Sequence, residues 1–118
     1  MSDHSLARTW AALRTDSRTA LIPYLTAGYP TWDASLAALR SAADVSDIIE
    51  VGVPFSDPLA DGPTIQRSTF EALRQGMTLP RTLALIAGGR GSSDFQPSRF
   101  FLAQCLHLRE ATGKFAGL

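Results

Sequence analysis

Apolar residues recur along the first 87 positions at two spacings, one typical of helices and the other typical of buried strands. Residues 5–14 carry apolar side chains at i, i+4 and i+7, which predicts an amphipathic helix that plugs or covers one end of the fold. Residues 20–26 and 47–53 are short apolar runs, and we expect them to form strands. Pro23, in the first of these runs, has no N–H to donate to a neighbouring strand, which favours a position at the edge of the sheet.

Capping residues delimit further helices between and after these strands. Thr31 is predicted to be the N-cap of a helix between the two strands. A second helix is predicted to begin at Pro63, which suits a first helical position, and to end at Gly76. A third is predicted to have Thr78 as its N-cap and to end at the glycine pair 88–89. Strands that alternate with helices are typical of right-handed parallel βαβ units, so the sequence predicts an α/β fold.

Composition narrows the range of partners. The 118 residues are 45% hydrophobic and carry no formal net charge, which favours a soluble unit and gives no electrostatic case for nucleic acid or an anionic membrane. No apolar run is long enough to span a bilayer and no signal-peptide core is evident, so we expect a cytoplasmic protein. The spacing of Cys105, His4 and His107 is not that of a structural zinc site, and we expect no bound metal.

Glu50 places a carboxylate inside a run that should be buried. Side-chain alternation puts Ile48, Glu50 and Gly52 on one face of the strand, and the glycine is expected to leave open space beside the carboxylate. Asp61 follows eleven positions later in a loop rich in proline and aspartate. A carboxyl group in apolar surroundings can hold or exchange a proton near neutral pH, so this strand end is a candidate for acid–base chemistry.

Plainer interpretations exist for the same residues. A glutamate at a strand end often begins a solvated loop, and Asp57 and Asp61 can be turn or cap residues before proline and glycine. Tyr24 can be core filler in a strand, where it shares a face with Ile22 and Thr26.

Two segments carry a resemblance to a known family. The sequence EVGVPFSDPLADGPTIQ at residues 50–66 resembles the signature of the tryptophan synthase alpha chain family, and IPYLTAGYP at 22–30 resembles its first strand and turn. The resemblance covers residues 5–87 and implies the N-terminal portion of a TIM (β/α)₈ barrel. A complete barrel takes about 250 residues, so 118 residues are expected to hold roughly its first third to half.

The resemblance also implies a reaction. Members of the family cleave indole-3-glycerol phosphate to indole and glyceraldehyde 3-phosphate in tryptophan biosynthesis, a retro-aldol step that needs no cofactor. Glu50 matches the family's general acid and base, and Asp61 matches the residue that receives the ring N–H. Tyr24 matches an aromatic side chain that packs beside the indole.

The same resemblance implies a protein partner. The family works as an α2β2 tetramer whose beta chain carries pyridoxal phosphate. Pro54, Phe55 and Asp57 are candidates for the interface with that beta chain. Two alternatives stay open: a noncatalytic remnant that at most binds a beta chain, and, less favoured, another phosphate-binding barrel enzyme.

The helical and strand pattern weakens from Gly88 onward. We expect residues 1–87 to form the first βα units and residues 88–118 to be a divergent or disrupted segment, since 88–97 is loop-like. The family's third strand should be β-branched, and 100–108 has no convincing match to it, although 100–103 can extend as a strand. A local frame change in the coding sequence, compensated near residue 111, is one hypothesis for this segment.

Overall fold

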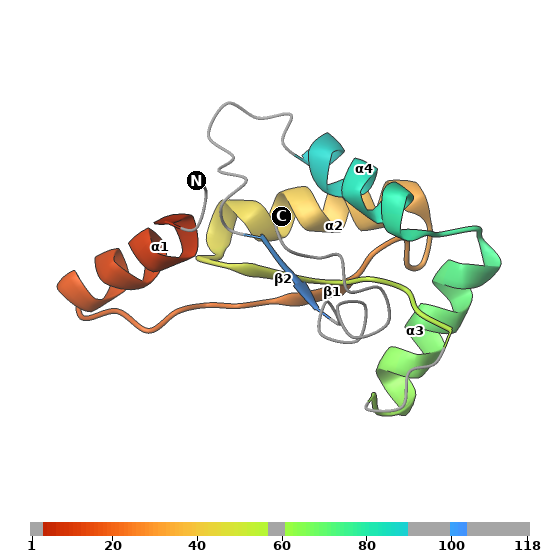
Figure 1. Cartoon of the computed structure of the whole chain (residues 1–118), viewed down its shortest axis with the longest axis horizontal. Coiled ribbons are helices and arrows are strands. Elements are labelled where there is room, and N and C mark those ends of the chain that lie inside the picture. Colours follow the sequence, from red (N-terminus) through yellow and green to blue (C-terminus); the bar gives the residue numbers. More distant parts are fainter. Residues whose placement is uncertain (1–3, 57–60, 90–99, 104–118) are drawn as a thin grey trace.

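The computed structural model describes residues 4–56, 61–89 and 100–103, and helices and strands alternate along them (Figure 1). In chain order the elements are α1 (His4–Thr15), β1 (Tyr24–Thr26), α2 (Trp32–Val45), β2 (Ile49–Gly52), α3 (Pro63–Arg74), α4 (Leu79–Gly89) and β3 (Phe100–Ala103). The three strands form one parallel sheet in the order β1-β2-β3. The predicted α/β fold with parallel strands is confirmed.

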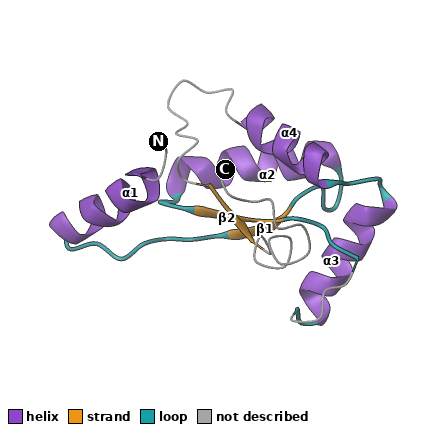
Figure 2. Cartoon of the chain, viewed as in Figure 1, coloured by secondary structure: helices purple, strands orange, loops and turns teal. Residues whose placement is uncertain are grey.

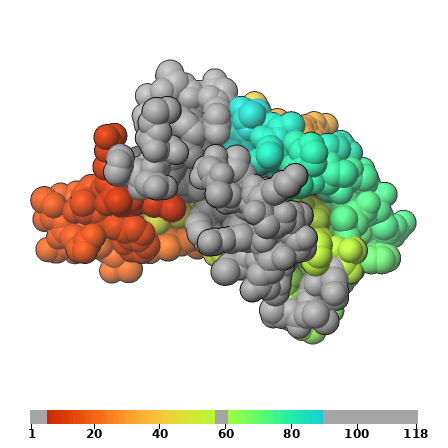
Figure 3. Space-filling model, in the orientation of Figure 1, coloured from red at the N-terminus to blue at the C-terminus, as the bar shows by residue number. Residues whose placement is uncertain are grey.

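The helices take different positions around this sheet (Figures 1 and 2). α2 packs against β1 and lies beside α4. α3 also packs against β1 and follows the carboxyl end of β2, whereas α1 precedes the amino end of β1. The space-filling view shows α1 at one end of the molecule and α3 with α4 at the other (Figure 3). The loop after β1 reaches the C-terminal end of α3, where Gln75 Nε2 donates to the Pro30 carbonyl.

The predicted helices are present, and their caps have the expected hydrogen bonds. Thr31 accepts the Ala34 amide at its Oγ1 at 3.2 Å, and Thr78 accepts the Arg81 amide at the same distance. α3 begins at Pro63, as predicted. It ends in a Schellman motif, in which the Met77 amide donates to the Ala72 carbonyl at 3.1 Å and the Gly76 amide to the Leu73 carbonyl at 2.9 Å.

Both early strands are shorter than predicted. The run 20–26 forms β1 only from Tyr24, although its first half still pairs: Asp47 donates its amide to the Leu21 carbonyl at 3.1 Å, and Glu50 donates to the Pro23 carbonyl at 2.9 Å. Pro23 thus lies just before a strand at the edge of the described sheet, where its missing N–H does no harm.

α4 ends at Gly89, so the glycine pair at 88–89 lies in the last turn of the helix that it was predicted to end. A Cβ at Gly89 would come within 2.8 Å of Leu39 Cδ2 on α2, and the Gly88 carbonyl accepts Arg40 Nη2 at 2.9 Å. The glycine at position 89 therefore lets α4 approach α2 closely. This reason depends on a neighbouring helix and has no local signal in the sequence.

β3 pairs in parallel with β2, from Ile49 opposite Phe100 to Gly52 opposite Ala103. The segment 100–103, which the sequence allowed to extend as a strand without a convincing match to the family's third strand, thus takes the place next to β2. β-branched residues were too strict a requirement, since strand propensity depends strongly on context. Residues 90–99 and 104–118, which include the rest of the expected divergent segment, lie outside the described residues.

The apolar core lies between the sheet and the helices that pack on it. Its buried members come from α2, β2, α3 and α4 and from the turns that follow β1 and α3: Ala27, Leu39, Ile49, Val51, Ala72, Met77, Leu85 and Ile86. Side-chain alternation along β2 turns Ile49 and Val51 into this core, each 1% exposed, and leaves Glu50 on the opposite face.

The turn after β1 supplies a stability test. Gly28 has φ +83°, and a Cβ there would lie 2.3 Å from Met77 Cγ in the core. Gly28→Ala is expected to lower the free energy of unfolding by about 2 kcal/mol or more, because it combines a left-handed backbone with overpacking. Urea denaturation followed by circular dichroism measures it.

Gly62→Ala is the matched control, since φ is −73° there and no atom lies within 4 Å of the added carbon. Gly62 is the N-cap of α3, where alanine is less favourable than glycine, so this change should lower the free energy of unfolding by less than about 1 kcal/mol. Equal losses in the two variants would contradict this account of the turn.

Candidate functional site

Glu50 and Tyr24 face each other across the two adjacent strands. They are direct partners in the parallel register of β1 and β2, and both side chains are half-buried. The neighbouring pair in the same register, on the same face, is Thr26 opposite Gly52. Four residues that alternate on two strands therefore form one polar surface beside the core.

The Tyr24 ring covers Gly52. A Cβ built on Gly52 would lie 2.0 Å from Tyr24 Oη and 2.6 Å from its Cζ. The open space that the sequence predicted beside Glu50 is thus filled, and the prediction was wrong in this respect. The ring that fills it comes from the neighbouring strand, so only the register of β1 on β2 could have revealed it.

Burial and two negative charges act on the Tyr24 phenol. Burial is the largest effect and raises the pKa of Tyr24 above its usual value, and the negative charges of Asp61 and Glu50 raise it further. A hydrogen bond from Thr26 acts in the opposite direction and lowers this pKa. Both carboxylates therefore lie within electrostatic range of the same phenol, so the structure brings Tyr24, Glu50 and Asp61 together.

Asp61 lies just before the start of α3. Gln66 Nε2 donates to the Asp61 backbone carbonyl at 2.6 Å, which ties this residue to the first turns of the helix. The Asp61 side chain is half-buried, and the helix begins two residues later at Pro63. The start of α3 thus positions the Asp61 backbone, and with it the carboxylate.

Two hydroxyl groups join this site although the sequence did not single them out as functional. Thr26 Oγ1 lies 2.7 Å from Ser68 Oγ and donates to Tyr24 Oη at 3.4 Å. Thr26 could have been found from its alternation with Tyr24 on one face of the strand. Ser68 had no such signal, because it reaches the site only when α3 docks on β1.

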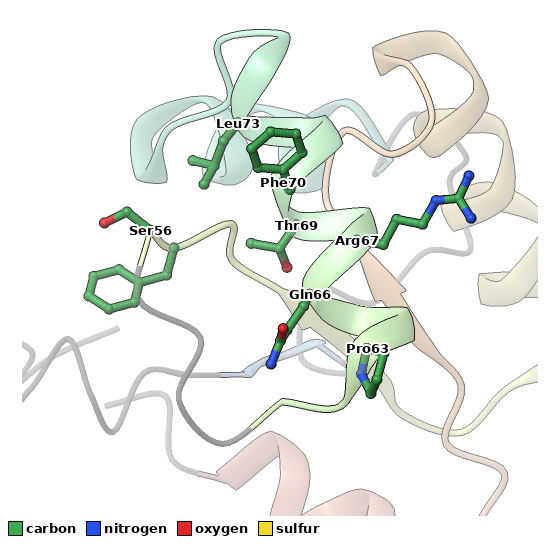
Figure 4. A pocket seen from close by; sticks show the side chains of 8 residues that line it. Ser56, Pro63, Gln66, Arg67, Thr69, Phe70 and Leu73 are labelled. Carbon is green, nitrogen blue, oxygen red and sulfur yellow. The ribbon is translucent and has the colours of Figure 1, made fainter.

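The residues that follow β2 form a second, separate hollow. Pro54 is buried and Phe55 half-buried, while Asp57 lies outside the described residues. A pocket with a cavity volume of about 410 Å³ lies between this loop and α3, and its lining residues are Phe55, Ser56, Pro63, Gln66, Arg67, Thr69, Phe70 and Leu73. In Figure 4, Ser56 lies on the opposite side of the hollow from α3, and Arg67 extends away from the loop. None of these residues is Tyr24, Glu50 or Asp61.

The described part of the chain holds no group of three His, Cys, Asp or Glu residues that could bind a metal ion. Cys105 and His107 lie outside it. In the same described ranges, no helix is long and apolar enough to cross a membrane.

Comparison with known proteins finds one family. A profile described as tryptophan synthase alpha chain matches residues 10–102, which extends past residue 87, where the resemblance was expected to end. The alpha chain of Methylibium petroleiphilum is 45% identical over 93 residues, which are 78% of this chain and 34% of that protein. The tryptophan synthase of Saccharomyces cerevisiae is 48% identical over 86 residues, which are 72% of this chain and 12% of that protein.

Solved structures agree with this match. A crystal structure of tryptophan synthase from M. tuberculosis, in its aminoacrylate-bound form, superposes with a TM-score of 0.72 at 41% identity. The superposition covers 83% of this chain and 39% of that one. The chain spans about a third of the length of the bacterial alpha chains that it matches.

The contact between Tyr24 and Gly52 can be tested by a double-mutant cycle. Gly52→Ala is expected to lower the free energy of unfolding by about 1–3 kcal/mol, because the new methyl group displaces the Tyr24 ring. In a Tyr24→Ala background the same change should cost almost nothing, since the space is then vacant. Urea denaturation of the four proteins gives the coupling, expected to be about 1 kcal/mol or more. Additive losses would contradict the contact.

Proposed function

The chain belongs to the tryptophan synthase alpha chain family, and we propose that it carries the acid–base end of an indole-3-glycerol phosphate lyase site. The observation that supports this most is the meeting of Tyr24, Glu50 and Asp61, since the charges of both carboxylates act on one phenol. These are the three residues that match the family's reacting and indole-packing positions.

The reaction needs one proton delivered and one removed. Glu50 protonates carbon C3 of the indole ring, which leaves positive charge on the ring nitrogen. Asp61 accepts a hydrogen bond from the ring N–H and stabilises that charge. Removal of the proton from the glycerol hydroxyl by Glu50 breaks the carbon–carbon bond, and its electron pair returns to the ring. The products are indole and glyceraldehyde 3-phosphate, and no cofactor takes part.

In this proposal Tyr24 positions the indole ring of the substrate. Its ring is fixed against Gly52 and so offers a firm flat surface for an indole. The half-burial of Glu50 and Tyr24 gives these groups partly desolvated surroundings, in which electrostatic interactions are stronger than in water.

We further propose that the loop after β2 contacts a tryptophan synthase beta chain through Pro54, Phe55 and Asp57, and that the assembly works in the cytoplasm as an α2β2 tetramer. The pocket beside Phe55 supports a docking role, because Phe70 on its wall is 61% exposed in the isolated chain. Pyridoxal phosphate would belong to the beta chain.

A noncatalytic role is the second candidate. The chain spans about a third of its relatives' length, and in this type of barrel a substrate phosphate is commonly held by loops after strands seven and eight, about 200 residues along the fold. A polypeptide with the first strands alone can keep the partner-binding loop without turning over substrate.

The role of Glu50 can be tested in a chimera that joins residues 1–87 of this chain to the remaining part of the Methylibium alpha chain. Glu50→Gln is expected to lower kcat for indole release about 10²- to 10⁴-fold, because the positioned acid–base group is lost. Asp61→Asn should also lower kcat, with less effect on KM.

Glu71→Gln is the matched control, since Glu71 forms an exposed ion pair with Arg74 on α3 and is not among the charges that act on Tyr24. It should leave indole release unchanged. Circular dichroism should show the same fold in all variants. Parental turnover in a folded Glu50→Gln chimera would refute the assignment.

The 118-residue polypeptide alone is expected to release no indole from indole-3-glycerol phosphate. The loops after strands seven and eight that commonly hold the phosphate lie beyond this part of the fold, so the substrate is not oriented against Glu50, and a displacement of about 1 Å can cost roughly 10²-fold. Hydrogen exchange, measured on the same sample, should still find the amides of 47–53 protected. Robust turnover by a monodisperse monomer would overturn this expectation.

A further inference from the structure

A row of three hydroxyl groups runs from α3 to the phenol beside the two carboxylates. Ser68 Oγ lies 2.7 Å from Thr26 Oγ1 and 2.9 Å from the Ile65 carbonyl oxygen. Thr26 Oγ1 in turn lies 3.4 Å from Tyr24 Oη. Thr26 is 8% exposed, so water has little access to the middle of this row.

Each hydroxyl group has a single proton, which restricts how the row can be arranged. The geometry makes Thr26 the donor to Tyr24 Oη, so the proton of Thr26 is used there. Ser68 Oγ is also placed to donate to the Ile65 carbonyl at 2.9 Å, so its one proton has two possible acceptors. With the Thr26 proton on Tyr24, the 2.7 Å contact takes Ser68 as its donor, which the geometry allows because either oxygen of that pair can donate. The Ile65 carbonyl does not need the Ser68 hydroxyl as a donor, because a carbonyl inside a helix already accepts a hydrogen bond from the amide four residues later.

We propose that Ser68 and Thr26 are positioning residues, which donate in sequence into the Tyr24 oxygen and thereby leave the phenolic proton for an acceptor on the carboxylate side of the site. This inference rests on the proposed function, because it gives the Tyr24 hydroxyl a part in that reaction. Among the described residues, Asp61 and Glu50 are the carboxylates whose charges act on this phenol.

The consequence is a phenol that donates its proton in a fixed direction. Since burial and the two carboxylate charges raise the pKa of Tyr24, the group is protonated at neutral pH and can act as a hydrogen-bond donor. The Thr26 hydroxyl polarises it, and hydrogen bonds in a row strengthen one another. Tyr24 then holds a carboxylate or a substrate oxygen at this strand end, in addition to packing against a flat ring.

The alternative arrangement makes the opposite prediction. If Ser68 donated to the Ile65 carbonyl, Thr26 would donate to Ser68 and the phenol would lose its donor. Ser68 would then compete with Tyr24 for the Thr26 proton. Removal of the Ser68 hydroxyl therefore distinguishes the two arrangements by the sign of its effect on the phenol.

The test is a titration of Tyr24 in the whole 118-residue chain. The sequence holds two tyrosines, so Tyr29→Phe leaves Tyr24 as the single phenol. Incorporation of 3-fluorotyrosine lowers the intrinsic phenol pKa, which lets the titration finish before alkaline unfolding, and fluorine NMR follows it. Circular dichroism at each pH checks the fold.

Thr26→Val is expected to raise the Tyr24 pKa by about half a unit to one unit, because the phenolate loses a hydrogen bond. Thr26→Ser, which keeps the hydroxyl, should restore the parental value. Ser68→Ala should raise the pKa by a smaller amount. Ser68→Ala places a good helix former on α3 and is expected to fold, so it decides the matter even if Thr26→Val does not fold.

A fall of the Tyr24 pKa in Ser68→Ala, or no change, would overturn the proposed direction of donation. A Tyr24 pKa that stays at the parental value in a folded Thr26→Val variant would overturn the row altogether. The titration needs no substrate, so it is independent of the lyase assay. Expected pKa shifts with an inactive chimera would refute the proposed function alone, whereas an active chimera without these shifts would refute the hydroxyl row alone.

Discussion

The parallel register of β1 on β2 is the constraint on which both the core and the candidate site depend. It sets Tyr24 opposite Glu50 and Thr26 opposite Gly52, while Val51 on the other face of β2 enters the core. A slip of one residue would turn Glu50 into the apolar core and Val51 toward the polar surface, because side chains alternate with period two. Burial of the core therefore fixes the geometry of the site.

Local signals in the sequence predicted most helices and their ends. Thr31 and Pro63 act within one turn of the helix that each begins, so the residues that form the cap are neighbours in the chain. Contacts between distant elements could not be predicted in this way. Gly89 is explained only by Leu39 on another helix, and Ser68 reaches the site only through the docking of α3 on β1.

The candidate site likewise has features that the sequence predicted and features that it could not. The signature around Glu50 and Asp61 could be recognised from consecutive residues, and the structure brings both within electrostatic range of Tyr24. What the sequence could not give is the environment of this phenol, a half-buried ring that packs on Gly52, accepts a hydrogen bond from Thr26 and lies within range of two negative charges. Membership of the family suggests which chemical roles Glu50 and Asp61 have, whereas the hydroxyl row is inferred from how α3 packs on β1 in this chain.

The contact between the Tyr24 ring and Gly52 tests the central claim most directly, since it exists only in this register. In the 118-residue chain with Tyr24 selectively labelled, nuclear Overhauser effects between its ring protons and the Gly52 Hα protons measure that contact. The account predicts strong cross-peaks, because Tyr24 Cε2 lies 3.1 Å from the position of a Cβ on Gly52. Absence of these cross-peaks in a folded sample would contradict the register, and with it the meeting of Tyr24, Glu50 and Asp61.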